Sequence, residues 1–197
     1  MPVYIAMLRG INVLGHKTIK MESLRASFEA LGFRNVKTYI ASGNVIFQTA
    51  KNSSLNLSKK IGDRISRDFG FPVSIVLITS KDLQKVVQRN PFAQKKAIDA
   101  SRLHVTFFAE LPAKTAWKNL RVLPRKPDLF LAGSQEVYLY CPDGYGRTKL
   151  SNAAFERILS VVATTRNWKT VNKLSEMAHA SVTPSGASRL KAPRQGR

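Results

Sequence analysis

The side chains best suited to bind a ligand are cations, amides and an indole that gather in short stretches between apolar runs. The densest stretch is TTRNWKTV, residues 164–171, where Arg166 can donate two N–H groups to one phosphate or carboxylate and Trp168 offers a flat face for stacking. In DGYGRTK, residues 143–149, Arg147 and Lys149 lie just before an expected helix, whose N-terminus favours an anion. Both stretches predict recognition of a negatively charged group.

Two further polar stretches occur in the first half of the chain, LRGINVLGHK at residues 8–17 and ASGN at residues 41–44. Binding residues concentrate in the connections of a rigid scaffold. We therefore expect the loops 9–17, 42–44, 144–149 and 166–173 to converge on one cleft that binds a phosphate-bearing small ligand. The predicted ligand-binding residues are Arg9, Asn12, Lys17, Ser42, Asn44, Arg147, Lys149, Arg166 and Trp168.

Each stretch also has a structural interpretation. Asn167 is a suitable N-cap for the last helix, and Trp168 is large enough to belong to the core. Ser42 and Asn44 are common turn residues, and Arg166 can form an ion pair inside the protein. The sequence does not decide between these alternatives. If the structural interpretations hold for all four stretches, the protein is a structural or interaction module without a ligand.

The sequence lacks the familiar catalytic and metal-binding patterns. Its three histidines are scattered, and HExxH, GxSxG and CxxC are absent. Only 12 residues are acidic, which disfavours a two-metal site. Cys141 is the single cysteine and ends the apolar run VYLYC, so we interpret it as a buried strand thiol. We predict no metal site, and the sequence assigns no catalytic residue, cofactor or reaction.

A strong positive charge is the main signal in the composition. The chain has 32 lysines and arginines against 12 acidic residues, for a formal net charge of +20. A basic surface attracts nucleic acid by counterion release, without reading its sequence. Non-sequence-specific nucleic-acid binding is therefore our alternative function. The aromatic run of RNA-recognition domains is missing, which disfavours stacking of RNA on a sheet.

Hydrophobic periodicity predicts the element order βαββαβ in the first half of the chain. Apolar residues such as Leu57, Ile61 and Ile65 recur at helical spacing, and Gly32 and Gly70 are suited to end the two helices. A short helix with Ser80 as its expected N-cap follows. The predicted strands are 3–8, 36–40, 44–48 and 73–78, and the predicted helices are 21–33 and 54–71.

The second half repeats this order with weaker signals. Strands are predicted at 103–109, 129–133, 137–141 and 162–165, and helices at 112–120, 151–161 and 167–178, with Pro112 in a first helical turn. We predict an α+β fold of duplicated ferredoxin-like (βαββαβ) plaits with an extra C-terminal helix. The predicted domains are a first plait at 1–90, a second plait with its C-terminal helix at 91–180, and a disordered basic tail at 181–197.

No apolar run reaches the roughly 18 residues of a membrane span, and Arg9 interrupts the apolar N-terminus, so it does not fit a signal peptide. We expect a cytoplasmic protein without a membrane partner. Its oligomeric state is not assigned by the sequence.

The combination of YIAMLRGINV, TYIASGNVIF, GYGRTKLSNAAFER and ATTRNWKTVNKL resembles the DUF1697 family, bacterial proteins of unknown function, over residues 1 to about 180. The resemblance implies a duplicated ferredoxin-like α/β architecture, in agreement with the predicted elements. It implies no reaction, ligand or catalytic residue.

Overall fold

The computed structural model describes residues 1–13, 15–124 and 126–182. The first part of the chain contains β1 (Val3–Leu8), α1 (Met21–Glu29), β2 (Arg34–Tyr39), β3 (Asn44–Gln48), α2 (Ser54–Phe69) and β4 (Ile75–Thr79), and then α3 (Ser80–Gln88). The second part contains β5 (Leu103–Phe108), α4 (Lys114–Lys118), β6 (Leu129–Ala132), β7 (Glu136–Tyr140), α5 (Asn152–Leu159) and β8 (Ala163–Asn167), and then α6 (Trp168–Val182). Short 3-10 helices lie at Ala100–Arg102, Asn119–Val122 and Tyr145–Arg147.

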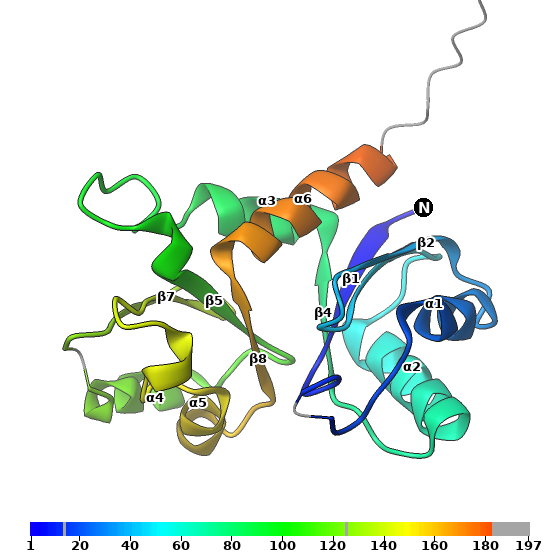
Figure 1. The fold of residues 1–197 in the computed structure, drawn as a ribbon, viewed down its shortest axis with the longest axis horizontal. Coiled ribbons are helices and arrows are strands. Elements are labelled where there is room, and N and C mark those ends of the chain that lie inside the picture. The colour runs from blue at the N-terminus through cyan, green and yellow to red at the C-terminus, as the bar shows by residue number, and fades with distance from the viewer. Residues whose placement is uncertain (14, 125, 183–197) are drawn as a thin grey trace, which may run out of the picture.

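The strands form two four-stranded antiparallel sheets with equivalent orders, β2-β3-β1-β4 and β6-β7-β5-β8. In each sheet the first strand of the βαββαβ unit lies between the third and the fourth strands of that unit. This is the ferredoxin-like arrangement. The α+β fold with two plaits is therefore the one predicted from the sequence (Figure 1). We call β1 to β4 with their helices the first plait and β5 to β8 with theirs the second plait.

Local sequence signals explain the best-defined elements. In α2, Leu57, Ile61 and Ile65 follow one another at intervals of four residues and are all buried, as their spacing predicted. The Ser53 hydroxyl caps the helix by accepting a backbone N–H of the first turn at 3.2 Å. Gly70 ends the helix in the left-handed conformation with φ of 79°, which favours glycine.

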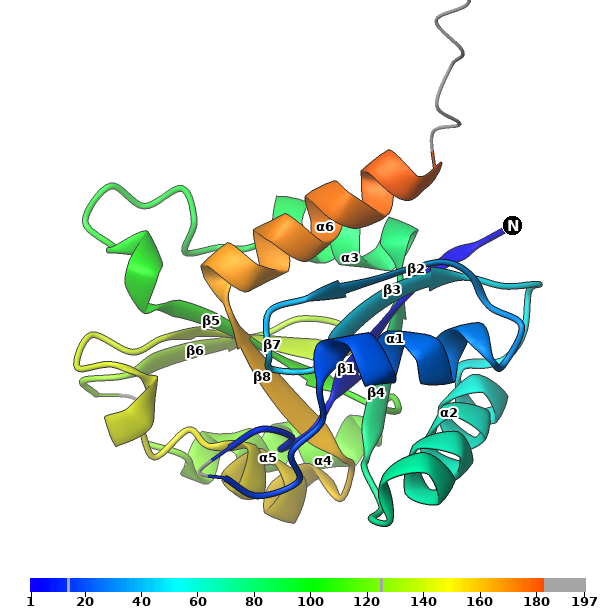
Figure 2. The same cartoon turned by 45° about the vertical axis from the view of Figure 1, so that its right-hand side comes forward.

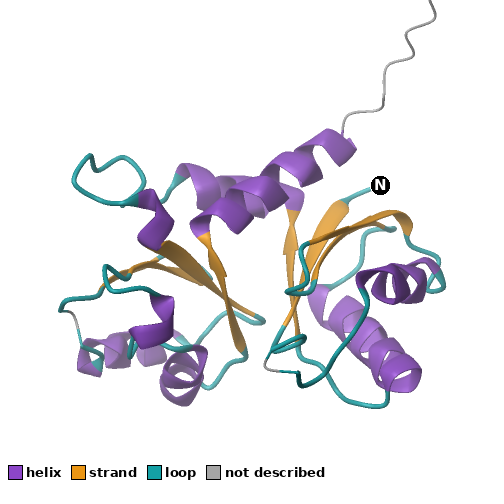
Figure 3. Ribbon diagram, in the orientation of Figure 1, coloured by secondary structure: helices purple, strands orange, loops and turns teal. Residues whose placement is uncertain are grey.

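The two plaits are joined by a shared hydrophobic core. Ile5 and Met7 of β1 pack in the same cluster as Val105 and Phe107 of β5 and Leu174 of α6, and we call this cluster the central core. The helices α3 and α6 contact each other beside it (Figures 1 and 2). The opposite faces of both sheets pack on their own helices (Figure 3). Since the face with Ile5 and Met7 is also buried, it is not open for the stacking of RNA bases.

Several predicted helix ends were wrong by one or more residues. Thr79, rather than Ser80, caps α3 by accepting the Asp82 N–H. Pro112 precedes α4 instead of lying in its first turn, because the helix begins only at Lys114. The last helix continues past residue 178 to Val182, and near its end the Gln48 side chain donates to the Ser181 carbonyl at 2.6 Å. Most of the predicted tail, residues 183–197, lies outside the described residues.

Candidate functional site

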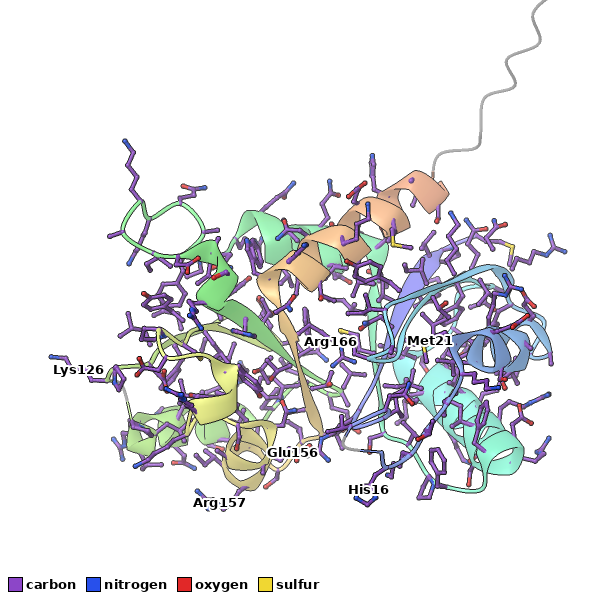
Figure 4. The ribbon with its side chains drawn as sticks, in the orientation of Figure 1. His16, Met21, Lys126, Glu156, Arg157 and Arg166 are labelled. Atoms are coloured by element: carbon purple, nitrogen blue, oxygen red, sulfur yellow. The ribbon has the colours of Figure 1, made fainter. Side chains whose placement is uncertain are left out.

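Arg166 lies in the middle of the molecule, where β8 meets the first plait (Figure 4). Its Nε donates to Asn44 Oδ1 at 2.6 Å, and its Nη2 donates to the carbonyl oxygens of Leu8 at 2.8 Å and Ser42 at 3.1 Å. Its Nη1 donates to Thr164 Oγ1 at 2.7 Å and to the carbonyl of residue 165 at 2.9 Å. A guanidinium has five N–H groups, so every donor of Arg166 has an acceptor inside the protein.

The charge of Arg166 is buried without an acidic partner. Only 8% of the residue is exposed, and none of its five acceptors is a carboxylate. Burial lowers the pKa of Arg166 to about 10, so the side chain still carries its charge at neutral pH. The visible role of Arg166 is to join the plaits, because no N–H group is left for a ligand.

Ser42 and Asn44 lie at the tip of the β2–β3 hairpin, as predicted. Asn44 Nδ2 donates to the Tyr39 carbonyl at 3.1 Å and to Ser42 Oγ at 2.9 Å, so the two residues stabilise the turn. Gly43 between them has φ of 74°, and its carbonyl accepts the Leu8 N–H at 2.8 Å. The hairpin tip therefore presents to Arg166 a rigid set of acceptors.

Arg9 forms a second link between the plaits. Its Nη2 makes a 2.7 Å ion pair with Glu156 Oε2 of α5, and the other oxygen of Glu156 accepts the Ala163 N–H at 2.9 Å. In Figure 4 Glu156 lies at the lower edge of the second plait, toward the loop that contains His16. The Arg9 Nε is buried without a hydrogen-bond partner. Arg9 is therefore held between the plaits by a carboxylate.

Asn12 and Lys17 hold their own loop in place. Asn12 Nδ2 donates to the carbonyls of Ile19 at 3.0 Å and Ala41 at 2.7 Å, and its Oδ1 accepts the Ile19 N–H at 2.7 Å. Lys17 Nζ donates to the Pro72 carbonyl at 2.9 Å. These bonds attach the loop to the hairpin tip and to the segment before β4.

The two residues at the β8–α6 junction have structural contacts. Asn167 Oδ1 accepts the Thr170 N–H at 2.8 Å, which confirms it as the N-cap of α6. Trp168 is half-buried against the central core. Its contacts fit the core interpretation that the sequence left open.

Arg147 and Lys149 line a cavity of about 270 Å³ that we call the outer cavity, and no other predicted site residue lines it. Figure 4 places Lys126, which also lines it, at the outer edge of the second plait, whereas Arg166 lies at the centre. The 144–149 stretch still contacts β8 next to Arg166, because the Tyr145 hydroxyl donates to Thr165 Oγ1 at 3.0 Å. The lining residues of the outer cavity are Pro124, Lys126, Pro127, Asp128, Asp143, Arg147 and Lys149.

A larger cavity of about 340 Å³ opens between the plaits, and we call it the inter-plait cavity. Lys85 of α3, Arg89 at the C-cap of α3 and Glu136 of β7 line it, and none of these was among the predicted site residues. Lys85 and Arg89 are four residues apart, so they share one face of α3. This spacing is their only signal in the sequence, and a solvent-exposed helix face has the same pattern.

Cys141 and His104 are both held in surroundings that disfavour their charged forms. Burial raises the pKa of the Cys141 thiol to about 11, so it is a weak nucleophile at neutral pH. Burial lowers the pKa of His104, whose ring stacks on Tyr145 with centroids 5.0 Å apart. Within the described ranges, no group of three or more histidines, cysteines or acids could hold a metal ion. No helix in the described part of the chain has the length and apolarity to cross a membrane.

Comparisons with known proteins support the fold through a solved structure and assign no activity. Residues 1–138 match the sequence profile of DUF1697, described as a protein of unknown function. A solved structure, the conserved bacterial protein SP0830 from Streptococcus pneumoniae, superposes with a TM-score of 0.70 at 25% identity. The similarity covers 90% of this chain and 98% of the other. No curated protein matches the sequence significantly.

Proposed function

Because this chain belongs to the DUF1697 family of proteins of unknown function, we propose its function from its own side chains: it binds a small phosphate-bearing anion in the outer cavity. Three cations, Lys126, Arg147 and Lys149, line this cavity, and no ion pair or hydrogen bond of the described residues uses their charged groups. The proposal rests on this group of unpaired cations, since charged donors make the strongest hydrogen bonds to phosphate oxygens.

The two acidic residues of the outer cavity differ in their surroundings. Asp128 is buried, and its Oδ2 accepts the Thr148 hydroxyl at 2.5 Å, whereas Asp143 is exposed. Three cations against two carboxylates leave one net positive charge in the lining. A volume of about 270 Å³ is several times the roughly 30 Å³ that a water molecule occupies in the liquid, so the cavity has room for a group larger than one phosphate. The cavity therefore suits a phosphate ester or pyrophosphate better than a lone phosphate ion.

The proposal is tested by titrating the protein with inorganic pyrophosphate in a calorimeter at low salt. Replacing Arg147 and Lys149 together by Ala is expected to weaken binding about tenfold or more, because each removes a charge-assisted hydrogen bond. Arg157→Ala is the matched control, since Arg157 is exposed on α5 and lies away from Lys126 in Figure 4. Equal affinity of the double variant and the control would rule out the outer cavity as the site.

Nucleic-acid binding is the second candidate function, and the net charge of +20 favours it. It predicts that single-stranded RNA and duplex DNA bind with similar affinity and that the affinity falls steeply as salt is raised. The Arg147→Ala and Lys149→Ala double variant would then lose only a small part of the affinity, because the charge is spread over the surface. Binding that persists at physiological salt and disappears in the double variant would contradict this candidate.

A further inference from the structure

The inter-plait cavity combines apolar surface with four charged side chains, those of Asp82, Lys85, Arg89 and Glu136. Its walls come from β4 and α3 of the first plait and from β5 and the β6–β7 turn of the second. Val76, Val86 and Phe107 supply apolar surface. Its volume of about 340 Å³ lies within the usual range of small-ligand sites, roughly 300 to 1,000 Å³, which commonly occur where two structural units meet.

Glu136 brings a buried carboxylate to this cavity. Only 7% of the residue is exposed, yet none of the ion pairs within the described ranges includes it. Its Oε2 accepts the Gln135 N–H at 2.8 Å, and its Oε1 accepts the Tyr138 hydroxyl at 2.9 Å. A carboxylate has about four acceptor positions, so two remain for further donors. A buried anion without a cation is costly, and a positively charged ligand group would relieve that cost.

The shape of the β6–β7 turn keeps this carboxylate in place. Gly133 packs against the Glu136 side chain so closely that an added Cβ would collide with its carboxylate. The Val86 carbonyl oxygen of α3 lies 3.1 Å from the same hydroxyl, whose single proton is shared between this oxygen and Glu136 Oε1, so the hydroxyl lies between the two plaits. The Glu136 carboxylate is therefore fixed by neutral donors before any ligand binds.

Arg89 supplies the opposite charge. It lies at the C-terminal end of α3, is exposed, and its guanidinium has no hydrogen bond or ion pair to any described residue. The neighbouring cation of the same helix, Lys85, is already paired with Asp82 at 2.8 Å. Burial and then Glu136 raise the pKa of Tyr138, and Arg89 opposes them, which indicates that both charges act near the same hydroxyl. Arg89 is thus the cation of this cavity that is free to meet an anionic group.

We propose that the inter-plait cavity binds a small zwitterion of the amino-acid class with an apolar body. Its carboxylate bonds to Arg89, its ammonium group bonds to Glu136, and its apolar part lies on Val76, Val86 and Phe107. A simple anion would leave the Glu136 carboxylate without a cation and be repelled by it. A simple cation would leave Arg89 unpaired, so the ligand that satisfies both groups carries both charges.

The test is calorimetric titration of the full-length protein with L-leucine, L-methionine and L-phenylalanine. Two analogues of leucine separate the charges: 4-methylpentanoate lacks the ammonium group and L-leucinamide lacks the carboxylate. At about pH 6.5 the amine of L-leucinamide is protonated. We expect at least one of the three amino acids to bind saturably. L-leucine is expected to bind about tenfold or more tightly than either analogue, because each analogue loses one charge-assisted contact.

Two variants assign the contacts. Arg89→Gln is expected to reduce the affinity for L-leucine to that for L-leucinamide, while leaving L-leucinamide binding unchanged. Glu136→Gln keeps the size of the side chain and is expected to reduce the affinity for L-leucine to that for 4-methylpentanoate. Lys81→Gln is the control, because Lys81 is an exposed cation on the same helix outside the cavity lining. Arg89 is exposed, so its variant carries the test even if Glu136→Gln fails to fold.

The proposal is overturned if none of the three amino acids binds, if L-leucine and its two analogues bind equally, or if Arg89→Gln binds L-leucine like the unchanged protein. The Arg147→Ala and Lys149→Ala double variant separates it from the outer cavity, because that variant is expected to bind L-leucine normally. Loss of L-leucine binding in the double variant would also contradict the assignment to the inter-plait cavity.

Discussion

Two arginines hold the plaits together by different physical means. Arg9 uses a carboxylate, Glu156, in a contact that is partly exposed to water, so its charge is weakly desolvated. Arg166 is buried and uses only carbonyl, hydroxyl and amide oxygens, whose partial negative charges surround the guanidinium. Hydrogen bonds to a charged group are stronger than neutral ones, and an acceptor left unpaired in the interior is costly. Arg166 should therefore matter more for stability than Arg9.

Replacing Arg166 by Met tests this difference at the scale of one residue. Met fills similar space and leaves the acceptors of Leu8, Ser42 and Asn44 without a donor. We expect the free energy of unfolding to fall by about 3 kcal/mol or more, since each buried unpaired group costs about 1 to 3 kcal/mol. Urea unfolding followed by circular dichroism measures the change. Arg157→Met, at an exposed position, is expected to change it by less than about 0.5 kcal/mol.

At the scale of elements, the tip of the β2–β3 hairpin is one of the places where the second plait is attached to the first. Its tip supplies Arg166 with two of its five acceptors, Asn44 Oδ1 and the Ser42 carbonyl. The tip is kept in position by Gly43, whose carbonyl accepts the Leu8 N–H, and by Asn12, which donates to the Ala41 carbonyl. These two hydrogen bonds fix the position of the turn, one to β1 and the other to the 9–19 loop.

Gly43→Ala is expected to destabilise this turn by about 2 kcal/mol or more. An added Cβ would lie 2.6 Å from Ile11 Cδ1 and 2.9 Å from Leu8 Cβ, and the φ of 74° is itself strained for alanine. Gly62→Ala in α2 is the control, because its Cβ would be 3.7 Å from the Val73 carbonyl oxygen, an ordinary contact. That variant should gain up to about 1 kcal/mol of helix stability. Equal urea midpoints for the two variants would contradict the predicted role of Gly43.

At the scale of the whole molecule, local signals predicted the elements well and the contacts between plaits poorly. The spacing of Leu57, Ile61 and Ile65 is a property of one helix, and the N-cap Asn167 acts within a single turn, so the sequence displays both. Arg166 and Asn44 are 122 residues apart, and nothing in either segment marks the other as its partner. In the sequence, Arg147 and Arg166 are both cations in short polar stretches. In the structure, Arg147 lines the outer cavity, whereas Arg166 is buried in the interior.

The shared central core predicts that the two plaits unfold together, although each has a complete βαββαβ order. Separating them would expose Ile5, Met7 and Phe107 and break the bonds of Arg166. In a Trp168→Phe variant, the remaining indole is that of Trp117. It contacts Phe108 in the hydrophobic cluster between the second sheet and its own helices. We expect its fluorescence and the far-ultraviolet circular dichroism of the whole chain to give the same urea midpoint, as two-state unfolding requires. A dichroism step without a matching change in fluorescence would show that the first plait unfolds independently.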